Sequence, residues 1–169
     1  MLDSPLVTDP HRHRNVQLVV DALSEGGAAP RAVEGLRVLP DAVSTAAAAA
    51  AALGVDVGAI ANSLIFDADG EPLLVLTSGA HRVDTARVAA LVGVATVRRA
   101  SPDFVREATG QVIGGVAPVG HPAPLRTLVD RALAGYDEVW AAGGIPHAVF
   151  PTTFAELVTV TKGEPAEVA

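Results

Sequence analysis

The sequence predicts one mixed α/β domain, and three observations lead to that fold class. The chain has 169 residues, of which 50% are apolar, enough for a single core of ordinary size. Segments with apolar residues at helical spacing alternate with short apolar runs typical of strands. A β-hairpin signal also lies in the middle of this alternation, so the sheet is expected to be mixed and not purely parallel.

The first predicted elements are a tail, a helix and a strand. Residues 1–12 contain two prolines and no periodicity, so we expect a flexible tail followed by a domain over 13–169. The segment Asn15–Leu23 carries valines and leucines at helical spacing, and two glycines follow it. Residues 31–39 alternate loosely, which favours a strand that ends at Pro40.

A second helix is predicted to start at Asp41. Seven consecutive alanines, Ala46–Ala52, form its centre, and alanine has the highest helix propensity. Gly54 is well placed to end this helix. Its small side chains are expected to allow close packing against a sheet.

The hairpin is the clearest local signal. Asp69-Gly70 separates two apolar runs, Ile60–Ala68 and Pro72–Thr77. Asp-Gly favours the positive φ angles of a two-residue hairpin turn. The two runs are therefore expected to pair as antiparallel strands.

Capping residues locate the elements after the hairpin. Asp84 is expected to begin a helix that ends at Gly93, and Ser101 with Pro102 opens a helix that closes at Gly110. The remaining predictions are a strand over 94–97, a loop rich in glycine and proline over 114–122, strands over 125–129 and 138–142, a turn over 143–146, a strand near Val149, a helix over about 152–159 and a last strand near Glu167.

Composition excludes several classes of protein. The 19 acidic and 12 basic residues give a net charge of −7, which argues against a general polyanion binder. The sequence has no cysteine, so disulfide scaffolds, zinc–thiolate sites and thiol nucleophiles are excluded. No uninterrupted apolar stretch reaches the roughly 18 residues of a membrane helix, and no signal-peptide core follows the N-terminus. We expect a soluble cytoplasmic protein that does not bind a membrane.

Familiar catalytic motifs are absent as well. Residues 110–115 are not followed by the Gly-Lys-Ser/Thr of a phosphate-binding loop. No dinucleotide fingerprint, nucleophile elbow or His-Glu-x-x-His is present. His11 and His13 alone would make a weak metal site. The sequence therefore predicts no metal ion and no cofactor.

Two loops rich in glycine and proline remain as candidate sites. The first, Gly114–Pro118, can present backbone N–H groups to an anion because glycine permits a close approach. The second, Gly143–Pro146, precedes His147. On the sequence alone, either loop is also consistent with an ordinary turn, and His147 with a structural histidine.

An ordered series of short motifs gives a more specific indication. The series consists of Asn62-Ser63-Leu64-Ile65-Phe66, Arg82-Val83-Asp84, Ala100-Ser101-Pro102, Thr109-Gly110, the loop from Gly114 to Gly120, Asp130, Gly143-Gly144 and Leu157. It covers about residues 30–168 and resembles the YbaK/ProX family of aminoacyl-tRNA deacylases, which is related to the editing domain of bacterial prolyl-tRNA synthetases. The Gly-x-x-x-Pro loop at Gly114–Pro118 is its most telling part.

The resemblance implies a fold, an activity and partners. The fold is a curved, mixed and mostly antiparallel sheet of about seven strands surrounded by helices. The activity is metal-independent hydrolysis of the ester between a small, wrongly attached amino acid, such as Ala, Cys, Ser or Thr, and a tRNA. The partners are a misacylated tRNA and, in some relatives, an aminoacyl-tRNA synthetase. Because an ester is already activated, such an enzyme mainly positions water and stabilises an oxyanion.

The resemblance also implies a set of site residues. The loop would hold the aminoacyl carbonyl and the ribose through backbone groups, and a small pocket would exclude larger amino acids by size. The implied catalytic residues are Asn62, Gly114, Gly115, Pro118 and His147; the substrate-binding residues are Ser63, Val116, Ala117, Asp130, Gly143 and Gly144; and the residues expected to contact tRNA are Arg82, Arg98 and Arg99.

Two positions depart from the family pattern. Many relatives have a lysine where this chain has Asn62, and a serine where it has Ala117. Asn62 can form hydrogen bonds but brings no charge. The missing lysine favours one alternative, a noncatalytic relative that binds tRNA, a nucleotide or a synthetase. A further alternative is a hydrolase that acts on a different small ester or amide in the same pocket. Asp130 is also able to cap a helix or to pair with Arg126 or Arg131.

Overall fold

The computed structural model describes residues 10–41 and 43–169, so most of the predicted tail lies outside the described residues. A short 3₁₀ helix, η1 (Pro10–Arg12), leads into α1 (Arg14–Glu25). The His13 side chain accepts a hydrogen bond from the backbone N–H of Asn15 at 3.1 Å and caps α1. The first predicted helix is confirmed.

The strand predicted over 31–39 is wrong for its first half. Residues there form a short helix, α2 (Pro30–Glu34), and only β1 (Arg37–Val38) is a strand. Proline is well tolerated in the first helical turn, where a backbone N–H has no helical partner to lose. Pro30 therefore starts a helix, although the side chains after it alternate like those of a strand.

The alanine-rich helix begins later than predicted. α3 (Ala46–Leu53) starts after Thr45, whose side chain accepts a hydrogen bond from the backbone N–H of Ala48 at 3.1 Å. Asp41 lies in a turn before it. Threonine is a favoured N-cap, and it competes successfully with Asp41 for that position. Gly54 ends α3 at a φ of 71°, as predicted.

The hairpin is confirmed, as β2 (Ile60–Ala68) pairs antiparallel with β3 (Glu71–Ser78). At the turn, Asp69 has a φ of 50° and Gly70 a φ of 93°. These positive values are the ones that a type I′ turn requires. The Asp69 carboxylate also accepts hydrogen bonds from the backbone N–H groups of Ala95 and Thr96, which ties the hairpin tip to the segment before β4.

The remaining elements follow the predicted order. They are α4 (Thr85–Val92), β4 (Val97–Arg99), α5 (Pro102–Thr109), β5 (Arg126–Asp130), the 3₁₀ helix η3 (Arg131–Gly135), β6 (Val139–Ala142), β7 (Ala148–Thr152), α6 (Phe154–Thr161) and β8 (Glu164–Ala166). The strand predicted over 94–97 lies a few residues further on, as β4. η3 was not predicted.

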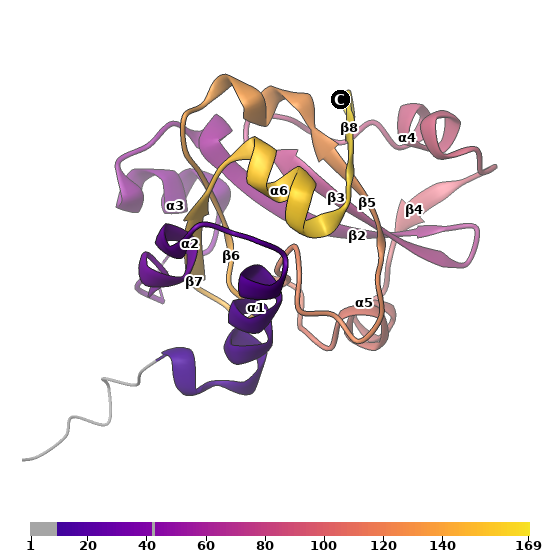
Figure 1. Ribbon diagram of the computed structural model, residues 1–169. Helices are drawn as coiled ribbons and strands as arrows, with labels where there is room; N and C mark the ends of the chain where they lie inside the picture. Colours follow the sequence, from indigo (N-terminus) through magenta and orange to yellow (C-terminus); the bar gives the residue numbers. More distant parts are fainter. Residues whose placement is uncertain (1–9, 42) are drawn as a thin grey trace, which may run out of the picture.

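The described strands form one mixed sheet of eight strands in the order β1-β7-β6-β2-β3-β5-β8, with β4 paired to β2. The antiparallel pairs are β1–β7, β6–β7, β2–β3 and β2–β4; the parallel pairs are β2–β6, β3–β5 and β5–β8. This arrangement confirms the predicted fold class. Figure 1 shows α6 across the β3–β5 part of the sheet, with α1 and α2 at one side and α4 and β4 at the other. Among the described residues, no helix is long and apolar enough to cross a membrane.

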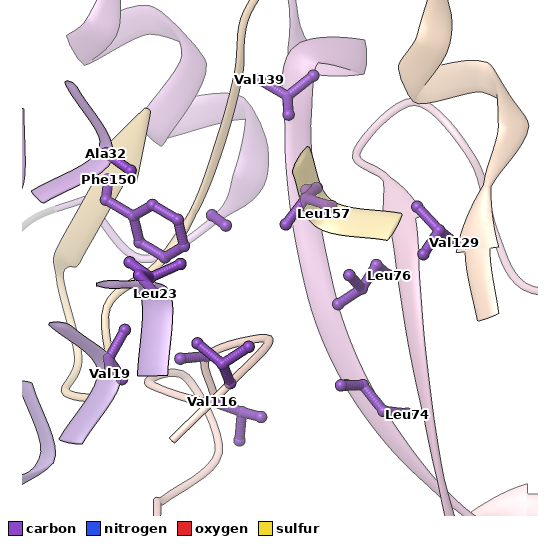
Figure 2. Packing of buried hydrophobic residues seen from close by; sticks show 14 of the residues in the cluster. Val19, Leu23, Ala32, Leu74, Leu76, Val116, Val129, Val139, Phe150 and Leu157 are labelled. Carbon is purple, nitrogen blue, oxygen red and sulfur yellow. The ribbon is translucent and has the colours of Figure 1, made fainter. Parts of the chain in front are cut away.

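Alternation along the strands divides the core between two faces of the sheet. Leu74 and Leu76 of β3, with Val129 of β5, belong to the largest apolar cluster. Residues of α1, α6 and β7 belong to the same cluster, and Figure 2 shows Leu157 of α6 close to Leu76 and Leu23 of α1 close to Phe150 of β7. Leu73 and Val75, which alternate with them, belong to a second cluster on the opposite face, under α4. Helices therefore cover both faces.

A third, smaller cluster lies on the α4 face but at the other end of β2. It joins Ile60 and Trp140 to Ala50 of α3. Along the same face of β2, Phe66 already belongs to the cluster under α4. The α3 and α4 clusters are thus separated by the middle of β2, where Asn62 and Leu64 belong to neither cluster.

The pairing of β2 is interrupted at the same place. β3 pairs with all of β2 on one edge. On the other edge, β6 lies opposite Ile60 and Ala61, and β4 lies opposite Phe66 to Ala68. The residues between them face neither strand. The middle of the strand therefore has an open edge, which positions the candidate site.

Candidate active site

The open edge of β2 lines a cleft of about 890 Å³. Its walls come from the N-terminal end of α3, the C-terminal end of β6, the segment before β7, the residues that precede α4, the end of β4 with α5, and the glycine-rich loop. A volume of this size accommodates a ligand larger than a free amino acid. β2 contributes residues 60–66 and forms the floor of the cleft.

The floor presents one polar and one apolar side chain between the two core clusters. Asn62 is half-buried, and none of the described hydrogen bonds engages its amide. Leu64 is 38% exposed. An asparagine amide offers two donor hydrogens and an acceptor oxygen to a ligand. Asn62, which sequence analysis assigned to the site, therefore lies in the cleft with its hydrogen-bonding groups available.

The charge of the cleft is opposite to that of the chain. Arg82 and Arg99 line it, and no aspartate or glutamate occurs among its described lining residues. Arg98, the neighbour of Arg99, pairs with Asp67 at 3.6 Å and is not part of the lining. Two cations without a carboxylate favour an anionic ligand, even though the chain carries a net charge of −7.

The glycine-rich loop presents fewer free amides than the sequence suggests. The N–H of Gly115 donates to the carbonyl of Val112 at 2.9 Å, and the N–H of Ala117 donates to Oε1 of Gln111 at 2.8 Å. Gly114, with a φ of 93°, and Val116 line the cleft. None of the described hydrogen bonds uses their amides. These two amides are the loop donors left for a ligand.

Two polar residues, one buried and one half-buried, hold this loop from behind. Gln111 is 1% exposed, and its Nε2 also donates to the carbonyl of Val119 at 3.4 Å. His121 contacts the carbonyl of Ala117 through Nε2 at 2.8 Å. Burial lowers the pKa of the His121 imidazole, and the hydrogen bond to Ala117 opposes that shift. Neither residue was recognised from the sequence, because a buried glutamine and a loop histidine carry no spacing signal.

The rest of the two loops is structural. A Cβ on Gly115 would lie 2.6 Å from the carbonyl carbon of Ile145, so this glycine lets the two loops touch. Ala117 and Pro118 are buried and absent from the cleft lining. Gly143 donates to the carbonyl of Ala148 at 2.8 Å, and Gly144, with a φ of 104°, packs against α1; neither lines the cleft.

His147 lies at the cleft with a defined orientation. Its φ of 68° is uncommon for a residue with a side chain, and it lines the cleft beside Pro146. Nδ1 is 2.9 Å from the carbonyl of Val43, which can only accept, so Nδ1 carries the proton. Nε2 is then the acceptor nitrogen of the neutral ring, 4.0 Å from Oδ1 of the fully exposed Asp41.

Asp130 lies away from the cleft. It is 1% exposed and accepts hydrogen bonds from the backbone N–H groups of Ser78 and Ala132, both at 2.9 Å. Oδ2 also contacts Nδ1 of His81 at 2.8 Å. The side chain therefore caps η3 and joins β3 to β5, which is the structural alternative that the sequence left open. It is not brought together with the other candidates.

Trp140 was missed by sequence analysis. It is 4% exposed, lines the cleft beside Ile60, and lies under the guanidinium of Arg37, which is 4.7 Å from the ring centroid. Within the described part of the chain, neither its indole Nε1 nor Oγ of Ser63 has a hydrogen-bond partner. As the single tryptophan of the chain it was visible in the composition, but nothing local assigned it to a site.

The cleft thus brings together only part of the sequence-predicted set. The residues that line it are Asn62, Ser63, Arg82, Arg99, Gly114, Val116 and His147; those that do not are Arg98, Gly115, Ala117, Pro118, Asp130, Gly143 and Gly144. No group of three or more His, Cys, Asp or Glu side chains in the described part of the chain is arranged to hold a metal ion.

Comparison with known proteins points to one family. The profile of the aminoacyl-tRNA editing domain matches residues 40–160. A proline–tRNA ligase of Bacillus licheniformis is 27% identical over 162 residues, which cover 90% of this chain and 28% of the ligase. A proline–tRNA ligase of Nitratidesulfovibrio vulgaris is 33% identical over 91 residues, which cover 54% of this chain and 16% of the ligase. The chain therefore spans less than a third of the length of these two ligases.

Other relatives are closer to this chain in length. The uncharacterised protein YwhH of Bacillus subtilis is 31% identical over 115 residues, which cover 68% of this chain and 73% of that protein. A crystal structure described as a proposed trans-editing enzyme for prolyl tRNA synthetase has a TM-score of 0.82 and 40% identity, and covers 92% of this chain and 97% of that chain. A hypothetical protein of known structure has a TM-score of 0.78 and 32% identity, over 89% of this chain and 98% of that chain.

A methyl group at Gly115 is expected to separate the two loops. Gly115→Ala places a Cβ against the backbone of Ile145 and Pro146, which is rigid and cannot yield like the end of a side chain. We expect a loss of about 1–3 kcal/mol in the free energy of unfolding, measured by urea denaturation. Gly135→Ala is the matched control, because no atom lies within 4 Å of its added Cβ. Equal stability of the two variants would contradict this close approach.

His121 is expected to make the stability of the protein depend on pH. The unfolded chain binds a proton at histidine near pH 6.5, whereas folded His121 binds it only at a lower pH. The free energy of unfolding therefore falls as the pH drops from about 7.5 to about 5.5. His121→Gln keeps an N–H donor toward Ala117 but does not titrate, so we expect a smaller fall over this interval. Urea denaturation at about pH 7.5 and about pH 5.5 measures this change in the free energy of unfolding. An identical change in the wild type and in His121→Gln would show that His121 does not contribute to the pH dependence.

Proposed function

We propose that this chain, which belongs to the aminoacyl-tRNA editing domain family, is a trans-editing deacylase. Such an enzyme hydrolyses the ester of a misacylated tRNA. The observation that carries the proposal is the cleft, where two arginines and unused backbone amides occur without a carboxylate. Such a site suits an anionic ligand whose reacting carbonyl gains negative charge in the transition state. The neighbour described as a proposed trans-editing enzyme supports the same reading.

The reaction needs no nucleophile from the protein. Water adds to the ester carbonyl, the carbon–oxygen bond to the ribose breaks, and the products are a free amino acid and a tRNA with its terminal hydroxyl restored. In the tetrahedral intermediate the former carbonyl oxygen carries the negative charge. The unused amides of Gly114 and Val116 are suited to stabilise that charge if the carbonyl lies against the loop. The hydroxyl next to the ester on the ribose is available to orient the water.

His147 is suited to handle the proton. With Nδ1 donating to Val43, the acceptor Nε2 remains available to take a hydrogen bond from the attacking water. Asn62, on the floor, can orient the ribose or the ester oxygen through its amide. We propose that the reaction proceeds without a metal ion.

We propose small amino acids, such as Ala, Ser, Thr or Cys, as the groups removed. Val105 and Val116 line the cleft, are 3% and 5% exposed, and belong to the largest apolar cluster. Packed β-branched side chains leave little space to expand, so a larger amino acid is excluded by size. The cytoplasm, where tRNA is aminoacylated, is the proposed location.

A noncatalytic relative is the second candidate, and Asn62 is the observation that favours it. An ammonium at this position on the floor would supply a third positive charge to a cleft that has only Arg82 and Arg99. Its absence weakens the electrostatic hold on phosphate or ribose. In this case the cleft would still bind the acceptor end of tRNA, and Asn62→Lys would raise hydrolysis.

A deacylation panel tests the proposal. Purified protein is mixed with tRNAs that carry Ala, Ser, Thr, Cys or Pro, and loss of the ester is timed against buffer. We expect rapid loss of one or two small amino acids. His147→Asn should slow this loss by about 100-fold, because asparagine tolerates a positive φ but provides no base. Gly135→Ala serves as the unaffected control. No loss from any tRNA, with or without the cognate synthetase, would contradict the deacylase and favour the noncatalytic candidate.

Arg98 and Arg99 are adjacent in the sequence, so substituting each of them separately tests whether the cleft contacts tRNA. Arg99→Gln removes a cation of the cleft, so we expect kcat/KM to fall about 5–10-fold and the salt dependence of binding to become shallower. Arg98→Gln removes a cation that pairs with Asp67 outside the lining, and a smaller effect is expected. Equal effects of the two substitutions would place the tRNA elsewhere. No effect of either would favour a small ester that lacks the nucleic acid.

A further inference from the structure

The direction of each backbone group along the open edge of β2 is fixed by two hydrogen bonds. On the β3 side, the N–H of Gly79 donates to the carbonyl of Ile60 at 2.7 Å. On the β4 side, the N–H of Asp69 donates to the carbonyl of Thr96 at 3.2 Å. In an antiparallel pair, the backbone groups of successive residues point alternately to the two edges. Even-numbered residues of β2 therefore bond to β3, and odd-numbered residues point to the opposite edge.

Ser63 is the odd-numbered residue that has no strand opposite it. β6 ends its pairing at Ala61, and β4 begins its pairing at Phe66. Continued by three residues, the register of β4 would put Pro102 opposite Ser63, but Pro102 is the first residue of α5 and has left the sheet. Both the N–H and the C=O of Ser63 thus point into the cleft without a backbone partner among the described residues.

The exposure of Ser63 agrees with this direction. The residue is partly exposed, whereas its Oγ is buried. The exposed surface of Ser63 therefore belongs to its backbone and Cβ. An unpaired backbone donor and acceptor at a protected site are costly to leave without partners, so this position favours a ligand that offers both.

The opening along this edge admits one residue and not a strand. β6 occupies the edge on one side and β4 occupies it on the other, so a peptide of several residues cannot pair with β2. The ligand must therefore carry an acceptor and a donor as close together as those of a single residue. An α-aminoacyl ester has this arrangement, with an α-ammonium and a carbonyl oxygen on adjacent carbon atoms.

We propose that the aminoacyl group of the substrate pairs with Ser63 as a one-residue β-strand. The α-ammonium donates to the C=O of Ser63, and the ester carbonyl accepts from the N–H of Ser63. This inference rests on the proposed function and names how the same cleft recognises its substrate. The N–H of Ser63 then also faces the oxygen that becomes negative when water adds, so it contributes to the stabilisation of the oxyanion.

The pairing also orients the substrate side chain. Residues directly opposite each other in a sheet direct their side chains to the same face. The side chain of Ser63 lies on the face of Ala61 and Ile65, which belong to the largest apolar cluster. The amino-acid side chain would therefore point toward Val105 and Val116, which belong to the same apolar cluster and line the cleft.

A backbone substitution tests the proposal directly. Ser63→Pro removes the N–H but breaks no bond to β3, because that N–H points to the open edge. Ser63→Ala keeps the N–H and is its comparator. On the aminoacyl-tRNA identified by the panel, we expect kcat/KM to be at least about 100-fold lower for Ser63→Pro than for Ser63→Ala, with similar far-UV circular dichroism. Equal rates in two folded variants would overturn the proposal.

Substrate analogues test it without altering the protein. The wild type is given tRNA esterified with alanine, with lactate or with N-acetylalanine, and each rate is divided by the rate in buffer. Lactate keeps a donor without charge, and acetylation removes the charge and adds bulk. We expect the enhancement to fall about 10-fold for lactate and about 100-fold for N-acetylalanine. The same enhancement for all three would overturn the proposal even if Ser63→Pro fails to fold.

Failure of the proposed function is distinguished by a binding experiment. If the wild type hydrolyses none of the esters, the stable amide formed by alanine and 3′-amino-3′-deoxyadenosine is titrated into the wild type, Ser63→Ala and Ser63→Pro. A Kd at least about 10-fold weaker for Ser63→Pro than for Ser63→Ala would support the pairing in a protein that binds but does not cleave. Equal affinities, or no binding to any of the three, would overturn it.

Discussion

The structure depends on the way β2 is paired. This strand has neighbouring strands on both edges, but the pairing is continuous along only one of them. β3 satisfies one edge along its whole length, whereas β6 and β4 share the other edge and leave its middle open. Because β6 carries Trp140 into the α3 cluster and β2 carries Phe66 into the α4 cluster, the same interruption separates two parts of the core. The cleft is the space between them, so fold and candidate site have a common cause.

Local chemistry allowed most elements to be predicted, and distant contacts explain the failures. Asp69-Gly70, Asp84, Ser101 and Gly54 each act within a few residues, and each has the predicted role. For the candidate site the agreement is partial: Asn62, Ser63, Gly114 and Val116 line the cleft, whereas Gly115, Ala117 and Pro118 of the same motifs do not. The segment over 31–39 is the main failure: Pro30 starts a helix that ends at Gly35, and a Cβ on Gly35 would lie 2.5 Å from Cγ of Pro151 on β7. No local pattern contains that contact.

The motif series mixed two kinds of residue that only the structure separates. Asp130 and Gly144 maintain the architecture: one joins β3 to β5, and the other lets a loop pack against α1. Gln111 and His121 were overlooked although they lie within eight residues of their partners, because their side-chain hydrogen bonds to the loop follow no recognisable spacing. A sequence shows which residue types are present, but it does not show which of them face a ligand and which hold the residues that do.

The distinction between residues that face a ligand and residues that hold the structure clarifies the two departures from the family pattern. Asn62 and Ala117 change a charge and a hydroxyl, both of which belong to side chains. The groups assigned to the carbonyl here, at Gly114, Val116 and Ser63, belong to the backbone, whose chemistry is the same for every residue except proline. Neither departure removes a backbone donor, and the buried N–H of Ala117 is already used by Gln111. In the proposed mechanism, the loss of a charge at Asn62 therefore bears on how firmly the nucleic acid is held, and the stabilisation of an oxyanion is assigned to the sheet edge and the loop.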